Sequence, residues 1–251
     1  LRDAVDVRMI SDVPLGSFLS GGVDSSAVVA MMAGLSSDPV STCSISFGDK
    51  RYNESAFAQE VATRYETKHH VEQVDPDAYD LIDKLANLYD EPFADSSAMP
   101  TYRVCQLARK HVTVALSGDG GDENLAGYRR HRWAYHEDQV RDMFPSWFRK
   151  PVFGALGKYY PKLDWAPRVV RAKSTFESLA RDSMEGYLHT VSVTPDTWRK
   201  QLFNDHFKQE LQGYEAIEVF RSVAKDAPVD HPLSLVQYLD LKTYLPGDIL
   251  T

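Results

Sequence analysis

The sequence predicts an α/β protein, in which a doubly wound, mainly parallel sheet is followed by a helical C-terminal lobe. Three observations support this fold class. Short apolar runs rich in β-branched residues alternate with longer segments of helical spacing, as in a parallel sheet covered by helices. A double glycine stands where the first run ends and a helical segment begins. Beyond about residue 135, tryptophans are scattered among prolines and amphipathic stretches, which favours helices.

The first elements follow from this alternation. A helix is predicted at Arg2–Ile10 and a strand at Gly16–Leu19. The next helix, Ser25–Leu35, carries small and apolar side chains on one face. The strand Ser41–Phe47 is short and ends before a Gly-Asp turn, and Glu54–Tyr65 again has helical spacing.

The sheet is completed by a third strand at His70–Val74 and a fourth at Val112–Leu116, with helices at Ala78–Tyr89 and Thr101–Lys110 between them. We assign residues 1–135 to this core and residues 136–251 to the helical part of the same domain. In the helical part we expect amphipathic segments at Ser174–His189 and Trp198–Gln212, with Thr194-Pro195-Asp196 as a helix start.

The composition excludes several classes of protein. Of 251 residues, 43% are apolar and 25% charged, as in ordinary globular proteins. The net charge of −8 argues against a nucleic-acid groove, because binding a polyanion needs a concentrated basic face. We find no apolar run of about 18 residues and no leader sequence, and so expect a cytoplasmic protein without a membrane span. Cys43 and Cys105 lack metal-ligand spacing and are expected to be buried free thiols.

The most informative stretch is Ser20–Ser26, with the sequence Ser-Gly-Gly-Val-Asp-Ser-Ser. A strand, a glycine turn and a helix N-terminus form a phosphate site, because the terminal N–H groups carry partial positive charge and glycines let an anion approach the main chain. The lysine with which a P-loop holds the β- and γ-phosphates is absent. We therefore expect a nucleotide bound for cleavage of a different bond, with a plain strand-to-helix corner as the alternative.

Three motifs together resemble the synthetase domain of the asparagine synthetase family: Ser20–Ser26, Glu91–Ala98 and Leu116–Glu123. The resemblance covers about residues 1 to 135. It implies a PP-loop ATP-pyrophosphatase fold, whose members split ATP between the α- and β-phosphates. It also implies the reaction of L-aspartate, ATP and ammonia to asparagine, AMP and pyrophosphate through β-aspartyl-AMP.

The loop chemistry and the resemblance together predict a set of residues that bind ATP and its pyrophosphate: Leu19, Ser20, Gly21, Gly22, Asp24, Ser25, Ser26, Phe47, Ser117 and Gly118. The resemblance places the backbone at Leu19 and Phe47 against the adenine, although core packing is an equal alternative for both. Asp24 would repel a pyrophosphate unless a cation lies between them. We therefore predict Mg²⁺ between Asp24 and Asp122, while Asp122 could instead cap a helix.

Asp119 is a departure from the family, whose best-known members carry glutamate at this position. We expect Asp119 to act as the base that deprotonates ammonia or its adduct, with a structural role in a turn as the alternative. Asp95, Ser96 and Ser97 resemble the segment that meets the amino-acid substrate, although such residues commonly form caps and turns. Ala126 replaces the first glycine of the usual Gly-Gly-Tyr, which is tolerated unless that position needs a positive φ.

Two clusters leave their roles open. The basic residues Arg129–Arg132 form either a solvated face with local ion pairs or an anion site. His69 and His70 have no carboxylate or thiol at ligand spacing and are expected at a strand edge rather than around a metal.

The resemblance further implies an N-terminal glutaminase domain as the source of ammonia. We expect that domain to be missing from this piece, together with a later lysine of the family beyond Thr251, and leave a homodimer open. Two other functions share these loops. One is an amidotransferase acting on a sugar, a peptide or another carboxylate, and the other is a nucleotide-binding module without turnover.

Overall fold

The computed structural model describes residues 1–49, 53–74, 81–91, 93, 95–161, 165, 167 and 171–251. The chain divides into two compact units. The first is Leu1–Gly121 with Asp248–Thr251, and the second is Asp122–Gly247. The α/β class predicted from the sequence is confirmed, because the first unit is built on a parallel sheet flanked by helices.

The sheet of the first unit has four strands in the order β3-β2-β1-β4, all parallel. Their bounds are β1 (Leu15–Phe18), β2 (Ser41–Phe47), β3 (Lys68–Val74) and β4 (Val114–Leu116). β1 lies in the centre, where Gly16 pairs with Ser41 on one side and Ala115 on the other. The carboxyl ends of these strands therefore share one edge of the sheet, where loops can converge on a ligand.

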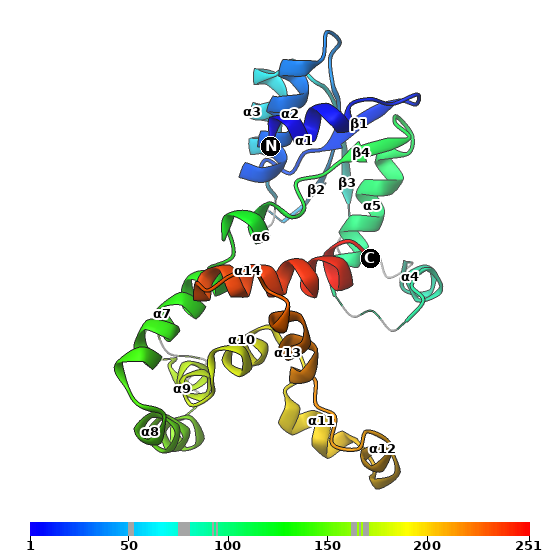
Figure 1. The fold of residues 1–251 in the computed structure, drawn as a ribbon. Helices are drawn as coiled ribbons and strands as arrows, with labels where there is room; N and C mark the ends of the chain where they lie inside the picture. Colours follow the sequence, from blue (N-terminus) through cyan, green and yellow to red (C-terminus); the bar gives the residue numbers. More distant parts are fainter. Residues whose placement is uncertain are drawn as a thin grey trace. The chain divides into compact units, whose positions relative to one another are not determined.

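Helices cover both faces of this sheet. These helices are α1 (Arg2–Arg8), α2 (Val23–Leu35), α3 (Ser55–Arg64) and α5 (Ala98–Ala108), and a further short helix, α4 (Ile82–Leu88), lies between β3 and α5 in the chain. Leu19 packs with Val29 of α2 and Ala58 of α3, whereas Cys43 packs with Leu107 of α5. Figure 1 shows α5 on the opposite side of the sheet from α2 and α3, as right-handed crossovers require when the chain returns from β3 to β4.

Some element ends differ from those predicted. β4 begins at Val114 rather than Val112, because the Val112 N–H still donates to the Ala108 carbonyl at the end of α5. Cys43 is buried as expected, but the expectation for Cys105 is wrong, since its side chain is exposed. Residues 78–80 of the predicted helix Ala78–Tyr89 and residues 92 and 94 of the middle motif lie outside the described residues.

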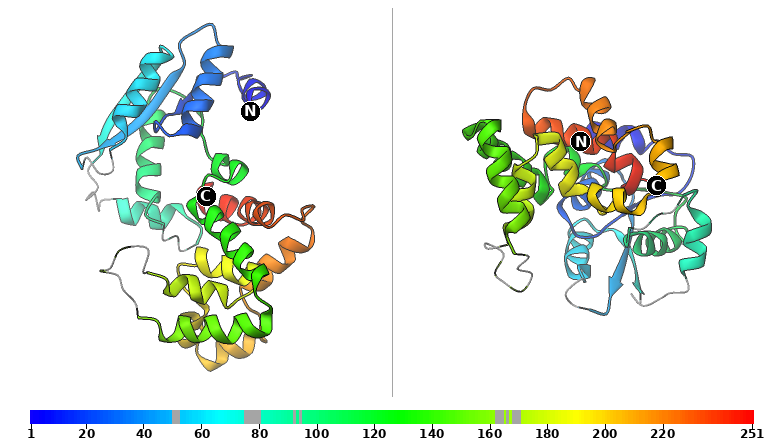
Figure 2. Two further views of the ribbon diagram at one scale, coloured as in Figure 1. Left: turned by 90° about the vertical axis from the view of Figure 1, so that its left-hand side faces the viewer. Right: turned by 90° about the horizontal axis from the view of Figure 1, so that it is seen from below.

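The second unit is helical throughout the part that the structure describes. Its elements are α6 (Gly121–Leu125, beginning at the boundary), α7 (Arg129–Met143), α8 (Ser146–Tyr159), α9 (Lys173–Leu179), α10 (Ser183–Val191), α11 (Asp196–Leu202), α12 (Asp205–Glu210), α13 (Ile217–Lys225), α14 (Pro232–Lys242) and the start of a π-helical turn, Leu245–Ile249, whose last two residues belong to the first unit. Tyr187, Phe220 and Leu239 lie in its apolar core, and α8 packs along α9 (Figure 2).

The two long amphipathic segments predicted in this unit are each two helices. Asp182 separates α9 from α10, and its Oδ1 accepts a hydrogen bond from the Glu185 N–H at 2.8 Å. Asn204 caps α12 in the same way, through Phe207 at 2.8 Å. The predicted start at Asp196 is confirmed as the first residue of α11.

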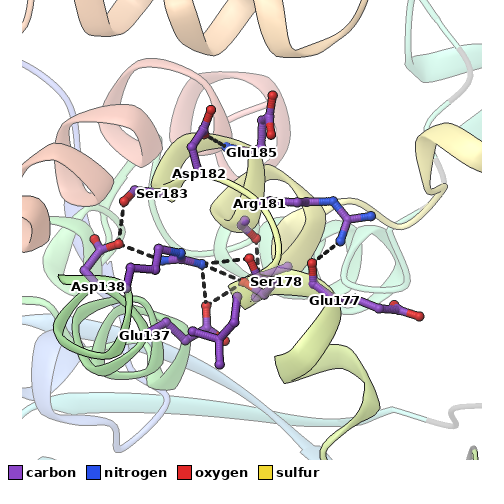
Figure 3. Close-up of polar contacts among 12 residues, drawn as sticks. Glu137, Asp138, Glu177, Ser178, Arg181, Asp182, Ser183 and Glu185 are labelled. Atoms are coloured by element: carbon purple, nitrogen blue, oxygen red, sulfur yellow. Dashed lines mark hydrogen bonds and ion pairs between the residues drawn. The ribbon is translucent and has the colours of Figure 1, made fainter. Parts of the chain in front are cut away.

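A buried charged cluster joins α7 to α9 and α10 (Figure 3). The Arg141 guanidinium donates to Asp138 at 2.6 Å, to Glu137 at 3.2 Å and to Ser178 Oγ at 3.0 Å. Ser178 donates in turn to Glu137 at 2.6 Å, and Ser183 donates to Asp138. Every charge in this cluster therefore has an opposite charge or a hydroxyl beside it, as burial demands.

Candidate functional site: two glycine loops at the carboxyl edge of the sheet

The first loop joins β1 to α2 through a backbone that only glycine adopts easily. Gly21 has a φ of +85°. A Cβ added there would lie 2.6 Å from the Ala58 nitrogen and 2.7 Å from the Phe57 Cβ. The loop thus rests directly against the first turn of α3. Gly22 is the N-cap of α2 and has no side chain to cover the helix terminus.

Two serines of this loop are hydrogen-bonded to each other. Ser20 Oγ and Ser25 Oγ lie 2.9 Å apart, and Ser25 Oγ also donates to the Gly22 carbonyl at 3.3 Å. The Gly22 N–H donates to Ser20 Oγ at 3.2 Å. These bonds fix the loop into a tight turn around the helix N-terminus.

Ser26 differs from the other two serines. Its Oγ is buried and has no hydrogen-bond partner among the described residues. A buried hydroxyl without a partner is costly, and a site that receives a ligand is one setting in which such a group is retained. The first intrahelical donor of α2 is the Ser26 N–H, so the preceding N–H groups point out of the helix end.

The second loop, after β4, meets the first one within the same unit. A Cβ on Gly118 would lie 2.6 Å from the Ser25 nitrogen, and one on Gly121 would lie 2.4 Å from the Asp24 Cγ. Gly120 has a φ of +85°, and the Gly121 N–H donates to the Gly118 carbonyl at 3.1 Å. The structure therefore brings together Asp24, Ser25, Gly118 and Gly121, which lie far apart in the sequence.

Leu19 and Phe47 lie at strand ends, as predicted. The Leu19 side chain is fully buried, its N–H donates to the Cys43 carbonyl at 3.0 Å, and its carbonyl accepts from Ser44. Phe47 is the last residue of β2 and is half-buried. Leu19 is thus a core residue, and the adenine contact at both positions remains a prediction.

A polar layer lies beneath these strand ends. His69 Nδ1 is 2.9 Å from Thr42 Oγ1, and its Nε2 is 3.5 Å from Ser44 Oγ. Burial lowers the pKa of His69, and the charge of His70 lowers it further. His69 is therefore held neutral among hydroxyls. No group of three or more His, Cys, Asp or Glu side chains that could hold a metal ion is present among the described residues.

Asp119 is exposed in the second loop, within electrostatic range of α5. Although Cys105 is exposed at the surface, partial desolvation of its sulfur raises the pKa of the thiol, and the charge of Asp119 raises it further. An exposed carboxylate at the carboxyl edge of the sheet is accessible to a substrate. Its role as a base remains a prediction.

Asp95, Ser96 and Ser97 precede α5 and form a turn. Asp95 Oδ1 accepts a hydrogen bond from the Ser97 N–H at 2.7 Å. This bond and that from the Ser97 hydroxyl, together with Asp248, hold the pKa of Asp95 below its usual value of 3.8. The geometry is that of a helix-start turn, which also explains why α5 begins three residues before the predicted Thr101.

Asp122 is the second residue of α6, so it lies in the helix rather than at its N-cap. Its carboxylate lies over Gly127, where a Cβ would be 1.9 Å from Asp122 Oδ1. A carboxylate is a suitable Mg²⁺ ligand, as is that of Asp24 in the first unit. The pairing of these two residues around a cation remains a prediction.

Sequence reasoning missed the residues around Asp122. Tyr128 OH donates to Glu123 Oε1 at 2.8 Å, and Glu123 is only 1% exposed. Burial raises the pKa of Tyr128, and Glu123 raises it further. A glutamate directly after the signature aspartate was visible in the sequence, but nothing in the sequence indicated that it is buried. Ala126 has a φ of +54°, so this position does take the positive φ that the usual glycine favours.

Comparison with known proteins identifies the family of this chain. The family model described as asparagine synthase matches residues 1–251. A Methanocaldococcus jannaschii protein, provisionally named glutamine-hydrolyzing asparagine synthetase 2, is 39% identical over 205 residues, which are 80% of this chain and 39% of that protein. Glutamine-hydrolyzing asparagine synthetase 1 of Bacillus subtilis is 31% identical over 251 residues, which are 100% of this chain and 38% of that protein.

A relative with a different name also aligns over 100% of this chain. It is the amidase chyE of Penicillium rubens, 26% identical over 286 residues and covered to 40% of its length. This chain therefore spans about two-fifths of the length of the curated relatives it matches. No described helix is both long and apolar enough to cross a membrane. Because the family model matches the whole sequence, the chain belongs to the asparagine synthase family.

Proposed function

We propose that the complete protein forms an amide at the expense of ATP, converting L-aspartate and ammonia to asparagine with release of AMP and pyrophosphate. The single observation that carries this proposal is the meeting of the two glycine loops, in which Gly118 and Gly121 lie against the first turn of α2. Family membership supports the same reaction class. Two relatives are named glutamine-hydrolyzing, so we propose that ammonia comes from glutamine through an N-terminal glutaminase domain.

The chemistry requires activation of the substrate, because a carboxylate has no leaving group that ammonia can displace. When the carboxylate attacks the α-phosphorus of ATP, pyrophosphate departs and the acid becomes bonded to AMP, which ammonia can then displace. In the proposal, Ser20, Ser25 and Ser26 and the N–H groups around Gly21 and Gly22 hold the departing pyrophosphate. The buried Ser26 hydroxyl, which has no hydrogen-bond partner among the described residues, would donate a hydrogen bond to this anion.

A cation is part of the proposal because Asp24 lies beside the phosphate loop. The carboxylates of Asp24 and Asp122 would hold Mg²⁺, which offsets negative charge on the phosphates. Asp119 is the proposed base toward ammonia or its adduct. As an exposed side chain in the second loop, it can reach a ligand at the carboxyl edge of the sheet.

The test is pyrophosphate release by the complete protein with ATP, Mg²⁺, ammonium and L-aspartate, with asparagine and AMP identified by mass spectrometry. We expect release above the blank without amino acid, and a large loss in Asp24→Asn. Asp38→Asn is the matched control, because Asp38 is an exposed acid just beyond α2, outside both loops. No release above the blank would overturn aspartate as the substrate. Tight ATP binding without AMP formation would instead favour a nucleotide-binding module.

A second candidate function uses the same two glycine loops but activates a different substrate carboxylate. Asp119 is one methylene shorter than the glutamate expected from the resemblance, and the Penicillium rubens relative is named an amidase rather than a synthetase. Either difference fits an amidotransferase that activates a sugar acid, a peptide or another carboxylate. A panel of amino acids, uronic acids and peptides in the same assay distinguishes the two, since the true substrate stimulates pyrophosphate release most.

A further inference from the structure

The turn that follows Asp122 fixes the position of the Asp122 carboxylate. The Gly127 N–H donates to the Asp122 carbonyl at 2.9 Å, which closes residues 122–127 into a compact turn. The side chain of Asp122 then occupies the space that a Cβ at Gly127 would need. The orientation of this carboxylate therefore depends on how firmly α6 and the turn are held.

Two side chains hold α6 from different sides. Tyr128 OH donates to Glu123 Oε1 at 2.8 Å. Gln237, from α14, donates through Nε2 to the Glu123 carbonyl at 2.8 Å and to the Asn124 carbonyl at 2.9 Å. Glu123 is thus bonded at both its side chain and its backbone, although it stands next to Asp122 in a helix of only five residues.

The ring of Tyr128 is held in place by the side chain of Arg130. The Arg130 guanidinium lies 3.6 Å from the centroid of the Tyr128 ring and donates to Asp240 at 2.7 Å. Asp240 also receives hydrogen bonds from His131 at 2.9 Å and Tyr187 at 2.7 Å. A cation stacked on the ring and anchored by a buried carboxylate leaves the Tyr128 hydroxyl little freedom to leave Glu123.

We infer that Tyr128, Glu123 and Gln237 are positioning residues for Asp122, and that this turn sets the affinity of the site for a divalent cation. The inference rests on the proposed function, in which Asp122 is a cation ligand. Removal of the Tyr128 hydroxyl leaves the buried Glu123 carboxylate without its donor, and an unsatisfied buried group must move toward another donor or toward water. Either response disturbs the residue next to Asp122.

The test measures binding rather than turnover. The complete protein is titrated with Mn²⁺ in the presence of α,β-methylene-ATP, which cannot be cleaved at the bond in question, and bound Mn²⁺ is followed by electron paramagnetic resonance. We expect Tyr128→Phe and Gln237→Met to weaken Mn²⁺ binding about tenfold or more, as outer-shell partners of a metal site do. Thermal unfolding is measured in parallel.

Ser178→Ala is the matched control. It removes a hydroxyl that donates to a buried glutamate, Glu137, at 2.6 Å, so it makes the same chemical change elsewhere in the unit. We expect this variant to lose stability while Mn²⁺ binding stays within about twofold of the wild type. If Tyr128→Phe behaves like Ser178→Ala, with lower stability and unchanged Mn²⁺ binding, the positioning role is overturned.

Two further variants separate the possible failures. If Tyr128→Phe does not fold, Glu123→Leu tests the same hydrogen bond from the other partner, because leucine fills the buried position but offers Tyr128 no acceptor; unchanged Mn²⁺ binding there also overturns the role. Asp122→Asn tests the premise. Unchanged Mn²⁺ binding in Asp122→Asn overturns the cation assignment in the proposed function. If Asp122→Asn weakens Mn²⁺ binding but the variants at Tyr128 and Gln237 do not, only the positioning inference is overturned.

Discussion

Gly21 has two independent reasons to be glycine. Its φ of +85° lies in the left-handed region, and its α-carbon lies so close to α3 that a Cβ would be 2.7 Å from the Phe57 Cβ. Strain and steric overlap therefore act at the same residue, and any side chain would push the first glycine loop away from α3.

Gly21→Ala is accordingly expected to lower pyrophosphate release by the complete protein about 100-fold, because small displacements of a binding group cost that much in rate. Gly34→Ala is the control, since Gly34 lies in α2 and a Cβ there meets nothing within 4 Å. That change should leave the rate unaltered and raise stability by up to about 1 kcal/mol through helix propensity. Equal rates in the two variants would contradict the role of Gly21.

Ala126 stores strain in the turn after Asp122. Its φ of +54° costs an alanine about 1 kcal/mol relative to glycine, part of which glycine loses again through the entropy of the unfolded chain. Ala126→Gly should therefore stabilise the protein by about 0.5 kcal/mol in urea unfolding. Ala155→Gly, at an exposed position inside α8, should destabilise it by about 1 kcal/mol. The same sign for both changes would show that Ala126 is unstrained.

At the scale of elements, α7 is held by buried charge rather than by an apolar stripe alone. Arg141 lies between Glu137 and Asp138 of its own helix and Ser178 of α9. Burial raises the pKa of Glu137, which the hydrogen bond from Ser178 and the charge of Arg141 oppose. Loss of the arginine would leave two carboxylates facing each other away from water.

Arg141→Met should thus cost about 3 to 5 kcal/mol of unfolding free energy, the range for breaking a buried ion pair. Arg221→Met offers the comparison, because Arg221 also pairs with two acids, Glu218 and Glu185, but its side chain is 44% exposed. We expect that change to cost less than about 1 kcal/mol. Similar losses in urea unfolding would argue against burial as the cause.

The cluster around Asp240 predicts a dependence on pH. Burial raises the pKa of Asp240, but hydrogen bonds from His131, Tyr187 and Arg130 outweigh it, so the pKa lies below the usual 3.8. A lowered carboxyl pKa gives stability that is present above 3.8 and is lost as the pH falls through the folded-state pKa. The stability difference between wild type and Asp240→Asn should therefore shrink as the pH falls below about 4. A difference that stays constant to pH 3 would contradict this.

Most elements of the sheet could be predicted because local pattern and tertiary environment agree. The strand Ser41–Phe47 has the predicted bounds, since its apolar run is bracketed by turn residues. The breaks at Asp182 and Asn204 were missed because a polar residue on the solvent face of an amphipathic helix and an N-cap look alike in sequence. Cys105 is exposed although its segment reads as apolar, because the helix has an outer face.

At the scale of the whole molecule, the parts of the candidate site that are continuous in the sequence could be predicted, whereas the contacts between distant residues could not. The two glycine loops are continuous motifs, so the sequence predicted both, and the structure adds that Gly118 and Gly121 lie against α2. The contact from Gln237 to Glu123 joins residues 114 positions apart. Neither residue has a pattern of its own, and only the packing of α14 brings them together.

The central claim concerns the whole protein: a substrate carboxylate attacks the α-phosphorus of ATP. The most direct measurement supplies the complete protein with ATP, Mg²⁺, ammonium and L-aspartate labelled with ¹⁸O in the β-carboxylate, and determines the mass of the AMP formed. The account predicts one ¹⁸O atom in AMP for each asparagine, because the attacking oxygen leaves with AMP when ammonia displaces it. Unlabelled AMP, or ADP with labelled phosphate, would contradict the account.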